Sequence, residues 1–64
     1  MTAARFTAAD KLEFIERGIK LRKQVFRNRI LTGRMSRAVA ERELALMQSI
    51  RDDYRALAEK ERLL

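Results

Sequence analysis

Residues 28–36 read NRILTGRMS, and this stretch divides the chain into two helical segments. Gly33 is one of only two glycines, and the chain contains no proline. A glycine directly after a helical segment commonly takes the left-handed conformation that ends a helix. Ser36 lies three residues later and is a favourable N-cap for a second helix. The stretch therefore predicts a short turn over residues 33–36 between two helices.

The segments on both sides of the turn are rich in the strong helix formers Ala, Leu, Glu, Lys, Arg and Met. Thr7 is the expected N-cap of the first helix, with Asp10 in the capping-box position. We expect helices over residues 8–32 and 37–62. Because a short connection forces the helices to run antiparallel, the sequence predicts one all-α domain over residues 1–64, an antiparallel helical hairpin.

The first helix carries two apolar stripes, about 120° apart around its axis. The larger stripe is expected to pack on the second helix and consists of Leu12, Ile15, Ile19, Phe26 and Ile30. The smaller stripe is a candidate interface with another chain and consists of Phe14, Leu21 and Val25. Two helices alone leave apolar surface uncovered, so we expect a symmetric homodimer that forms a four-helix bundle. Helices of a different protein are the alternative.

The second helix repeats its apolar positions at alternating spacings of four and three, which is a heptad pattern. The predicted seam consists of Glu43, Met47, Ile50, Tyr54, Leu57, Glu61 and Leu64. Glu43 lies in its centre, so we expect a structural ion pair between Glu43 and either Arg29 or Arg22 that fixes the register of the helices. Gly18, in the middle of the first helix, is expected to permit the close approach of a neighbouring helix.

Positive charge is concentrated around the turn. Residues 17–40 hold eight basic and no acidic side chains, so the net charge of +6 arises from this segment. The candidate contacts to phosphates or to an acidic partner are Arg27, Arg29, Arg34 and Arg37. Cations at the end of a helix also complement its dipole, but Arg34 and Arg37 lie where the dipole does not favour them. Binding to phosphates would be directed at the nucleic-acid backbone and would depend steeply on salt.

The composition argues against catalysis. The chain has no histidine and no cysteine, which excludes imidazole and thiolate chemistry, and 64 residues leave little room for an enclosed pocket. We expect no enzyme, no catalytic residue, no cofactor, no metal and no small-molecule substrate. No uncharged apolar run is long enough to span a membrane, and the N-terminus lacks the apolar core of a signal peptide. The sequence therefore predicts a cytoplasmic protein without a membrane partner.

One stretch carries a recognisable series of features. They are Val25 with Phe26 in a basic run, Gly33 to Ser36, Ala40 to Glu43, Met47 with Ile50, and Asp53 to Arg55. Residues 21–55, which contain them, resemble a segment of short uncharacterised phage and prophage helical-hairpin proteins. Asn28 departs from that pattern, in which Pro-Arg often follows the aromatic residue. The resemblance implies an origin in a mobile element and brings no established activity.

The sequence thus predicts a small non-enzymatic helical interaction protein. The resemblance implies a phage or prophage accessory or regulatory protein that binds another macromolecule, and a protein is the leading partner. One alternative is a nucleic-acid-binding accessory protein that contacts phosphates through the basic turn. The other is a structural assembly subunit. All three need a helical bundle with a charged end, so the sequence leaves them open.

Overall fold

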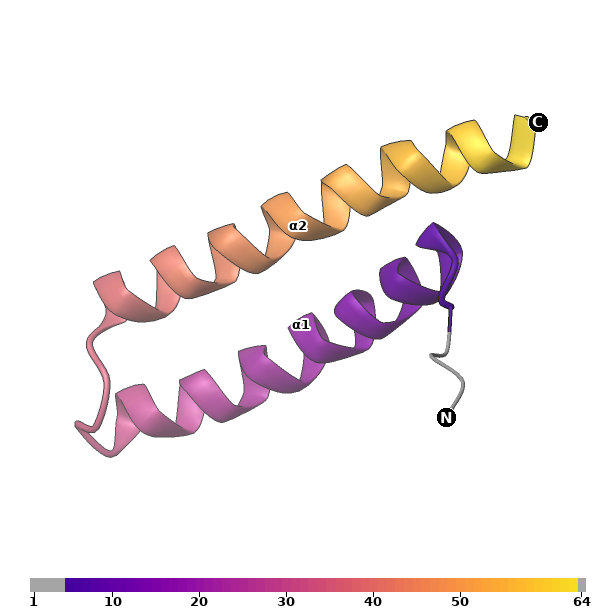
Figure 1. Ribbon diagram of the computed structural model, residues 1–64. Helices are drawn as coiled ribbons and strands as arrows, with labels where there is room; N and C mark the ends of the chain where they lie inside the picture. Colours follow the sequence, from indigo (N-terminus) through magenta and orange to yellow (C-terminus); the bar gives the residue numbers. More distant parts are fainter. Residues whose placement is uncertain (1–4, 64) are drawn as a thin grey trace.

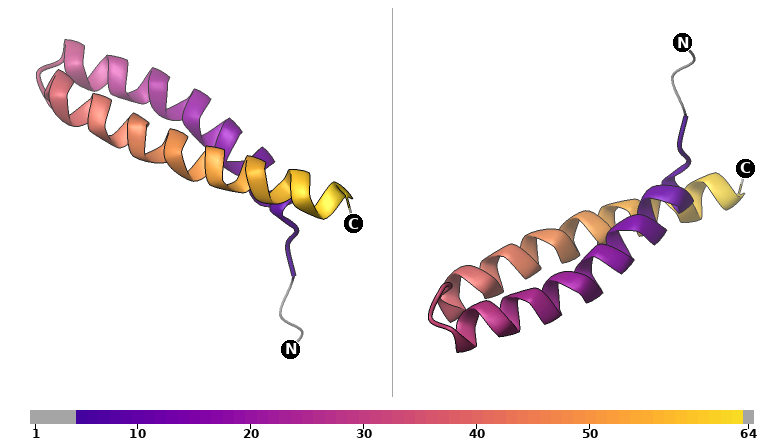
Figure 2. Two further views of the ribbon diagram at one scale, coloured as in Figure 1. Left: turned by 90° about the horizontal axis from the view of Figure 1, so that it is seen from above. Right: turned by 90° about the horizontal axis from the view of Figure 1, so that it is seen from below.

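The computed structural model describes residues 5–63, which form two α-helices joined by a tight turn (Figure 1). Helix α1 spans Ala8–Leu31 and helix α2 spans Arg37–Leu63. The helices pack antiparallel and stay side by side in every view (Figures 1 and 2). The predicted all-α antiparallel hairpin is confirmed. The last residue of each helix differs by one position from the expected ranges 8–32 and 37–62.

A capping box begins α1. The Thr7 hydroxyl accepts a hydrogen bond from the Asp10 amide, and the Thr7 amide donates one to the Asp10 carboxylate, both at 3.1 Å. A residue from the far end of the chain adds a third bond, because the Ala8 amide donates to Oε1 of Glu61 at 3.2 Å. These bonds satisfy amides that have no partner inside the helix. The last of them ties the start of α1 to the end of α2.

The turn is built on Gly33, whose φ angle is +73°. In this left-handed conformation the Arg34 amide donates to the Arg29 carbonyl at 2.8 Å, and the Gly33 amide donates to the Ile30 carbonyl at 3.1 Å. This pair of bonds is the Schellman motif, which satisfies carbonyls at the end of a helix. Ser36 then caps α2, because its hydroxyl accepts from the Val39 amide at 3.1 Å.

The core of the hairpin is thin. Among the described residues only Ala8, Ile19, Phe26 and Ala40 are buried. The larger stripe of α1 faces α2 as expected, with Ile19 and Phe26 at its centre. Except for the half-buried Gln48, the residues of α2 that are buried or half-buried recur at spacings of four and three and form the inward stripe: Ala40, Leu44, Met47, Arg51, Tyr54 and Ala58.

This inward stripe corrects the seam predicted for α2. Met47 and Tyr54 belong to both, but Glu43, Ile50 and Leu57 are exposed. The inward stripe uses small residues such as Ala40, which let the two helices approach closely. It also accepts the aliphatic stem of Arg51, whose charged group reaches the surface. Of the other predicted members, Glu61 is exposed and Leu64 lies outside the described residues.

Gly18 is half-buried, and a Cβ placed on it would lie 3.6 Å from Cε of Met47, which is an ordinary van der Waals distance. The packing of α2 therefore does not require glycine at this position, in contrast to the expected close approach. Neither helix of residues 5–63 is long and apolar enough to cross a membrane.

Candidate interaction surface

Eight large nonpolar side chains are exposed on the two helices. Leu31 and Leu63 are the last residues of α1 and α2, and the other six recur with helical periodicity. On α1, Phe14 is 71% exposed and Leu21 is 62% exposed. The exposed members on α2 are Val39, Leu46, Ile50 and Leu57. We call these six residues the apolar face. Val25, the third member of the predicted smaller stripe, is half-buried at its border.

The six residues lie on one side of the hairpin. They are rotated from the inward stripe by about 140–160° on α1 and by about 80–120° on α2, in the same sense when each helix is viewed from its own N-terminus. Because the helices are antiparallel, rotations of the same sense turn both sets to the same side of the molecule. A groove of about 720 Å³ lies between two of them, Phe14 of α1 and Ile50 of α2. Its other lining residues are the nonpolar or aromatic Phe6, Ile15 and Tyr54 and the charged Asp10, Lys11, Glu13 and Arg17.

The edge of this groove is fixed by a contact between the helices. Nζ of Lys11 lies 5.6 Å from the centre of the Tyr54 ring, within the range of a cation–π interaction. Lys11 belongs to α1 and Tyr54 to the inward stripe of α2. The pair therefore links the two helices at the groove, which Lys11, Tyr54 and Phe14 all line.

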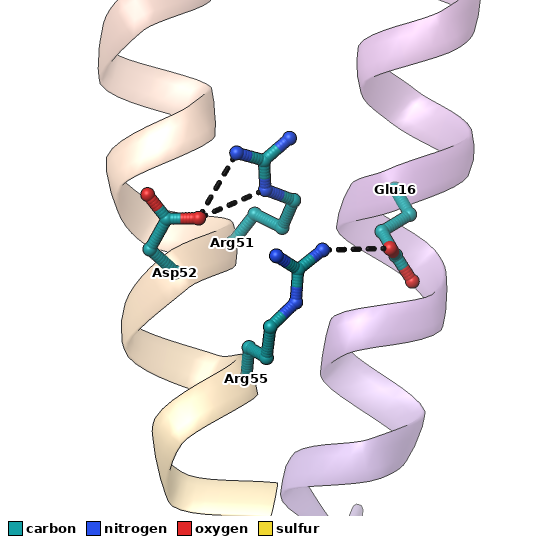
Figure 3. A network of polar contacts seen from close by, with 4 residues as sticks. All are labelled: Glu16, Arg51, Asp52 and Arg55. Carbon is teal, nitrogen blue, oxygen red and sulfur yellow. Dashed lines mark hydrogen bonds and ion pairs between the residues drawn. The ribbon is translucent and has the colours of Figure 1, made fainter.

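The opposite side of the hairpin is polar (Figure 3). Nη2 of Arg55 on α2 lies 3.3 Å from Oε2 of Glu16 on α1 and pairs the two helices. One turn earlier, Nε and Nη2 of Arg51 bind Oδ1 of Asp52 at 3.0 and 2.9 Å. The hairpin is thus a single layer of two helices, with these ion pairs on one side and the apolar face on the other.

The four candidate arginines do not form one cluster. Arg27 and Arg37 line a shallow pocket of about 450 Å³ on the side away from the apolar face, together with Lys23 and Glu41. Arg29 lies two residues after Arg27, so the two side chains leave α1 about 160° apart. Arg34 lies in the turn and is exposed. The structure therefore brings Arg27 and Arg37 together and leaves Arg29 and Arg34 apart from them.

The predicted ion pair of Glu43 is not formed in the single chain. Glu43 is exposed, and the ion pairs among residues 5–63 include neither this side chain nor those of Arg22 and Arg29. The reason is the position of the inward stripe, which passes through Leu44 and turns Glu43 toward the apolar face. Two polar contacts that do link the helices, Glu61 to Ala8 and Arg55 to Glu16, were not predicted from the sequence. The alignment of the two helices about the tight turn could have predicted them, because it places residue 61 level with residue 8.

Within residues 5–63 no group of three or more Asp or Glu side chains is arranged to hold a metal ion. Comparison with protein-family models, curated proteins and solved structures found no match to this chain. The resemblance over residues 21–55 therefore stays a prediction from the sequence.

Proposed function

We propose that this chain is a non-enzymatic helical interaction module that binds a protein partner through its apolar face. The observation that carries the proposal is the exposure of six large nonpolar side chains on one side of a two-helix layer. Contiguous apolar patches of this kind mark interaction surfaces. A role as a phage or prophage accessory protein is part of the proposal and is supported only by the resemblance over residues 21–55.

The periodicity of the apolar face favours helices as the partner. Phe14, Leu21 and Val25 on α1 follow spacings of seven and four, and Val39, Leu46 and Ile50 on α2 repeat them. Stripes with heptad spacing pack against other helices at about 20°. A subunit of a larger assembly would use the same face.

Site-specific photo-cross-linking tests this proposal. A photoreactive amino acid replaces Leu46 in one variant and the neighbouring Ala45 in the matched control, in cells that make the chain. Both positions are exposed in the hairpin, but they point about 100° apart. We expect protein adducts from position 46 and few from position 45. Equal adduct yields from the two positions would contradict the proposal.

A second candidate function is contact with nucleic-acid phosphates, favoured by the cluster of Lys23, Arg27 and Arg37 around one pocket. Its test is a fluorescence-anisotropy titration with duplex DNA and with structured RNA at several salt concentrations. If the cluster binds phosphates, Arg27→Ala and Arg37→Ala weaken binding and flatten its salt dependence, because each removes a cation from the cluster. Arg29→Ala is the matched control, since Arg29 lies outside the cluster. Equal losses in all three variants would refute a localised phosphate site.

A further inference from the structure

We infer that the occupant of the apolar face is a second copy of this chain, stacked face to face with its turn at the opposite end. This inference rests on the proposed function and names its partner.

The uncovered area is large enough for such an interface. The chain exposes 5710 Å² of surface and has a mass of 7.5 kDa. A compact monomer of this mass exposes about 4,250 Å² by the surface scaling of globular proteins. The difference exceeds the roughly 800 Å² that each partner contributes to a standard interface. The Cα atoms extend only 13 Å in the thinnest direction, which corresponds to one layer of helices. A second layer completes the usual two-layer arrangement of a domain.

The spacing of the residues along the apolar face suits packing against the same face of a second copy of the chain. Each helix has an inward stripe that packs within the hairpin and an outward stripe on the common side. A helix in a four-helix bundle contacts two neighbours and needs two such stripes. The occupant must therefore present two antiparallel helices of matching length with the same spacing. A second hairpin, with helices of 24 and 27 residues, meets these requirements.

The distribution of charge selects the orientation. Residues 20–47, which form the half of the hairpin with the turn, hold eight basic and two acidic side chains. Residues 5–19 and 48–63, which form the open half, hold seven of each. With both turns at one end, two strongly positive halves would lie against each other, and like charges in contact are unfavourable. With the turns at opposite ends, each positive half lies on a neutral half. The two-fold axis then places α1 on the partner's α1 and α2 on the partner's α2.

Sedimentation equilibrium tests the partner. We expect the full chain to sediment at twice its 7.5 kDa mass at micromolar concentration. Leu46→Glu should raise the dissociation constant by at least about a hundredfold, because symmetry places two carboxylates in the interface. Ala45→Glu adds the same charge on the next residue and should leave the dimer intact. Circular dichroism checks that both variants remain helical. If Leu46→Glu unfolds, Leu46→Ala replaces it in the sedimentation measurement. A monomeric wild-type chain would overturn the inference, as would equal weakening by the two glutamates.

A distance measurement tests the orientation. The chain has no cysteine, so Leu31→Cys provides a single site for a spin label, at a position that is 78% exposed near the turn. In the proposed dimer the two labels are about 36 Å apart along the helix axes, because residue 31 lies about 12 residues from the middle of α1 in each copy. With both turns at one end, the axial separation is close to zero. The shorter distance would overturn the proposed orientation.

The outcomes for the partner and for the function can be told apart. If the chain is monomeric but position 46 still gives adducts to a different protein, the inferred homodimer is refuted and the proposed function stands. If the chain is monomeric and position 46 gives no specific adducts, both the inferred homodimer and the proposed function are refuted.

Discussion

At the scale of single residues, one carboxylate links the start of α1 to the end of α2. Glu61 accepts a hydrogen bond from the Ala8 amide at the first turn of α1, where the helix dipole favours negative charge. Glu43, which the sequence suggested for the role of linking the helices, is exposed and turned toward the apolar face. The register depends on the ends of the hairpin and on Arg55 with Glu16 instead of on a buried pair at its centre.

Replacing Glu61 with Ala should therefore destabilise the hairpin by about 1 kcal/mol, the usual cost of losing a helix cap. For a domain of this size, that loss lowers the melting temperature by roughly 4–8 °C. Glu59→Ala is the matched control, since within residues 5–63 Glu59 pairs only with Arg62, on the exposed end of α2. Thermal unfolding followed by circular dichroism measures both variants. Equal melting temperatures would show that the bond from Ala8 contributes nothing.

The two glycines should respond in opposite directions to replacement with Ala. Gly33 has a φ of +73°, which costs residues with a Cβ about 1–2 kcal/mol, so Gly33→Ala should lower the stability. Gly18 lies inside α1 with an ordinary distance to Met47, so Gly18→Ala should raise the stability by about 1 kcal/mol. Urea unfolding measures both. A loss in Gly18→Ala would mean that another chain approaches α1 more closely than α2 does.

At the scale of the helices, α2 contains two overlapping heptad patterns. The inward stripe includes Ala40 and Arg51, whereas the exposed stripe includes Ile50 and Leu57. Hydrophobicity alone ranks the exposed stripe higher, and for this reason the sequence pointed to the wrong seam. What decided the packing was size and shape: a small residue brings α1 close, and the long stem of Arg51 covers apolar surface while its guanidinium reaches Asp52.

A substitution on each side of α2 tests this assignment. Ala40 is 3% exposed, so Ala40→Leu should overpack the contact with α1 and destabilise the hairpin by about 1–3 kcal/mol. Ala45→Leu makes the same change on the exposed side and should alter the stability by less than about 0.5 kcal/mol. Chemical denaturation compares the two. If Ala45→Leu were the more harmful change, the inward stripe would be misplaced.

The helices themselves were predictable from the sequence because their signals are local. The capping box at Thr7 and the glycine at position 33 specify the start and the end of α1 within a few residues. The candidate interaction surface was harder to predict from the sequence. Phe14 and Leu21 could be recognised as an extra stripe, but their alignment with Leu46 and Ile50 depends on how both helices are rotated in the hairpin. That rotation is a property of the packed pair.

At the scale of the whole molecule, apolar surface and charge are both unevenly distributed. The apolar face covers one side of the layer, and the half with the turn carries the whole net charge of +6. These two asymmetries act on different properties of an assembly. The apolar face determines which side is covered, and the charge determines the relative orientation of the chains.

Stability should consequently depend on protein concentration. If the second copy covers the apolar face, a hundredfold dilution lowers the melting temperature of the wild-type chain, because association stabilises the folded state by mass action. Leu46→Glu should melt at a temperature that does not change on dilution. Calorimetry or circular dichroism over this concentration range provides the measurement. An unchanged wild-type melting temperature would indicate that one chain folds alone.

The bond between Glu61 and Ala8 also bears on the order in which the hairpin forms. The turn at Gly33 joins the helices through residues 32–36, whereas residues 8 and 61 are the hydrogen-bond partners farthest apart in sequence among residues 5–63. Closing a short loop costs less entropy, so the helices should pair first beside the turn and last at the open end. Removing the Glu61 carboxylate should then accelerate unfolding and leave the folding rate nearly unchanged. The contact at the open end of the hairpin should therefore determine the lifetime of the native state by slowing its unfolding.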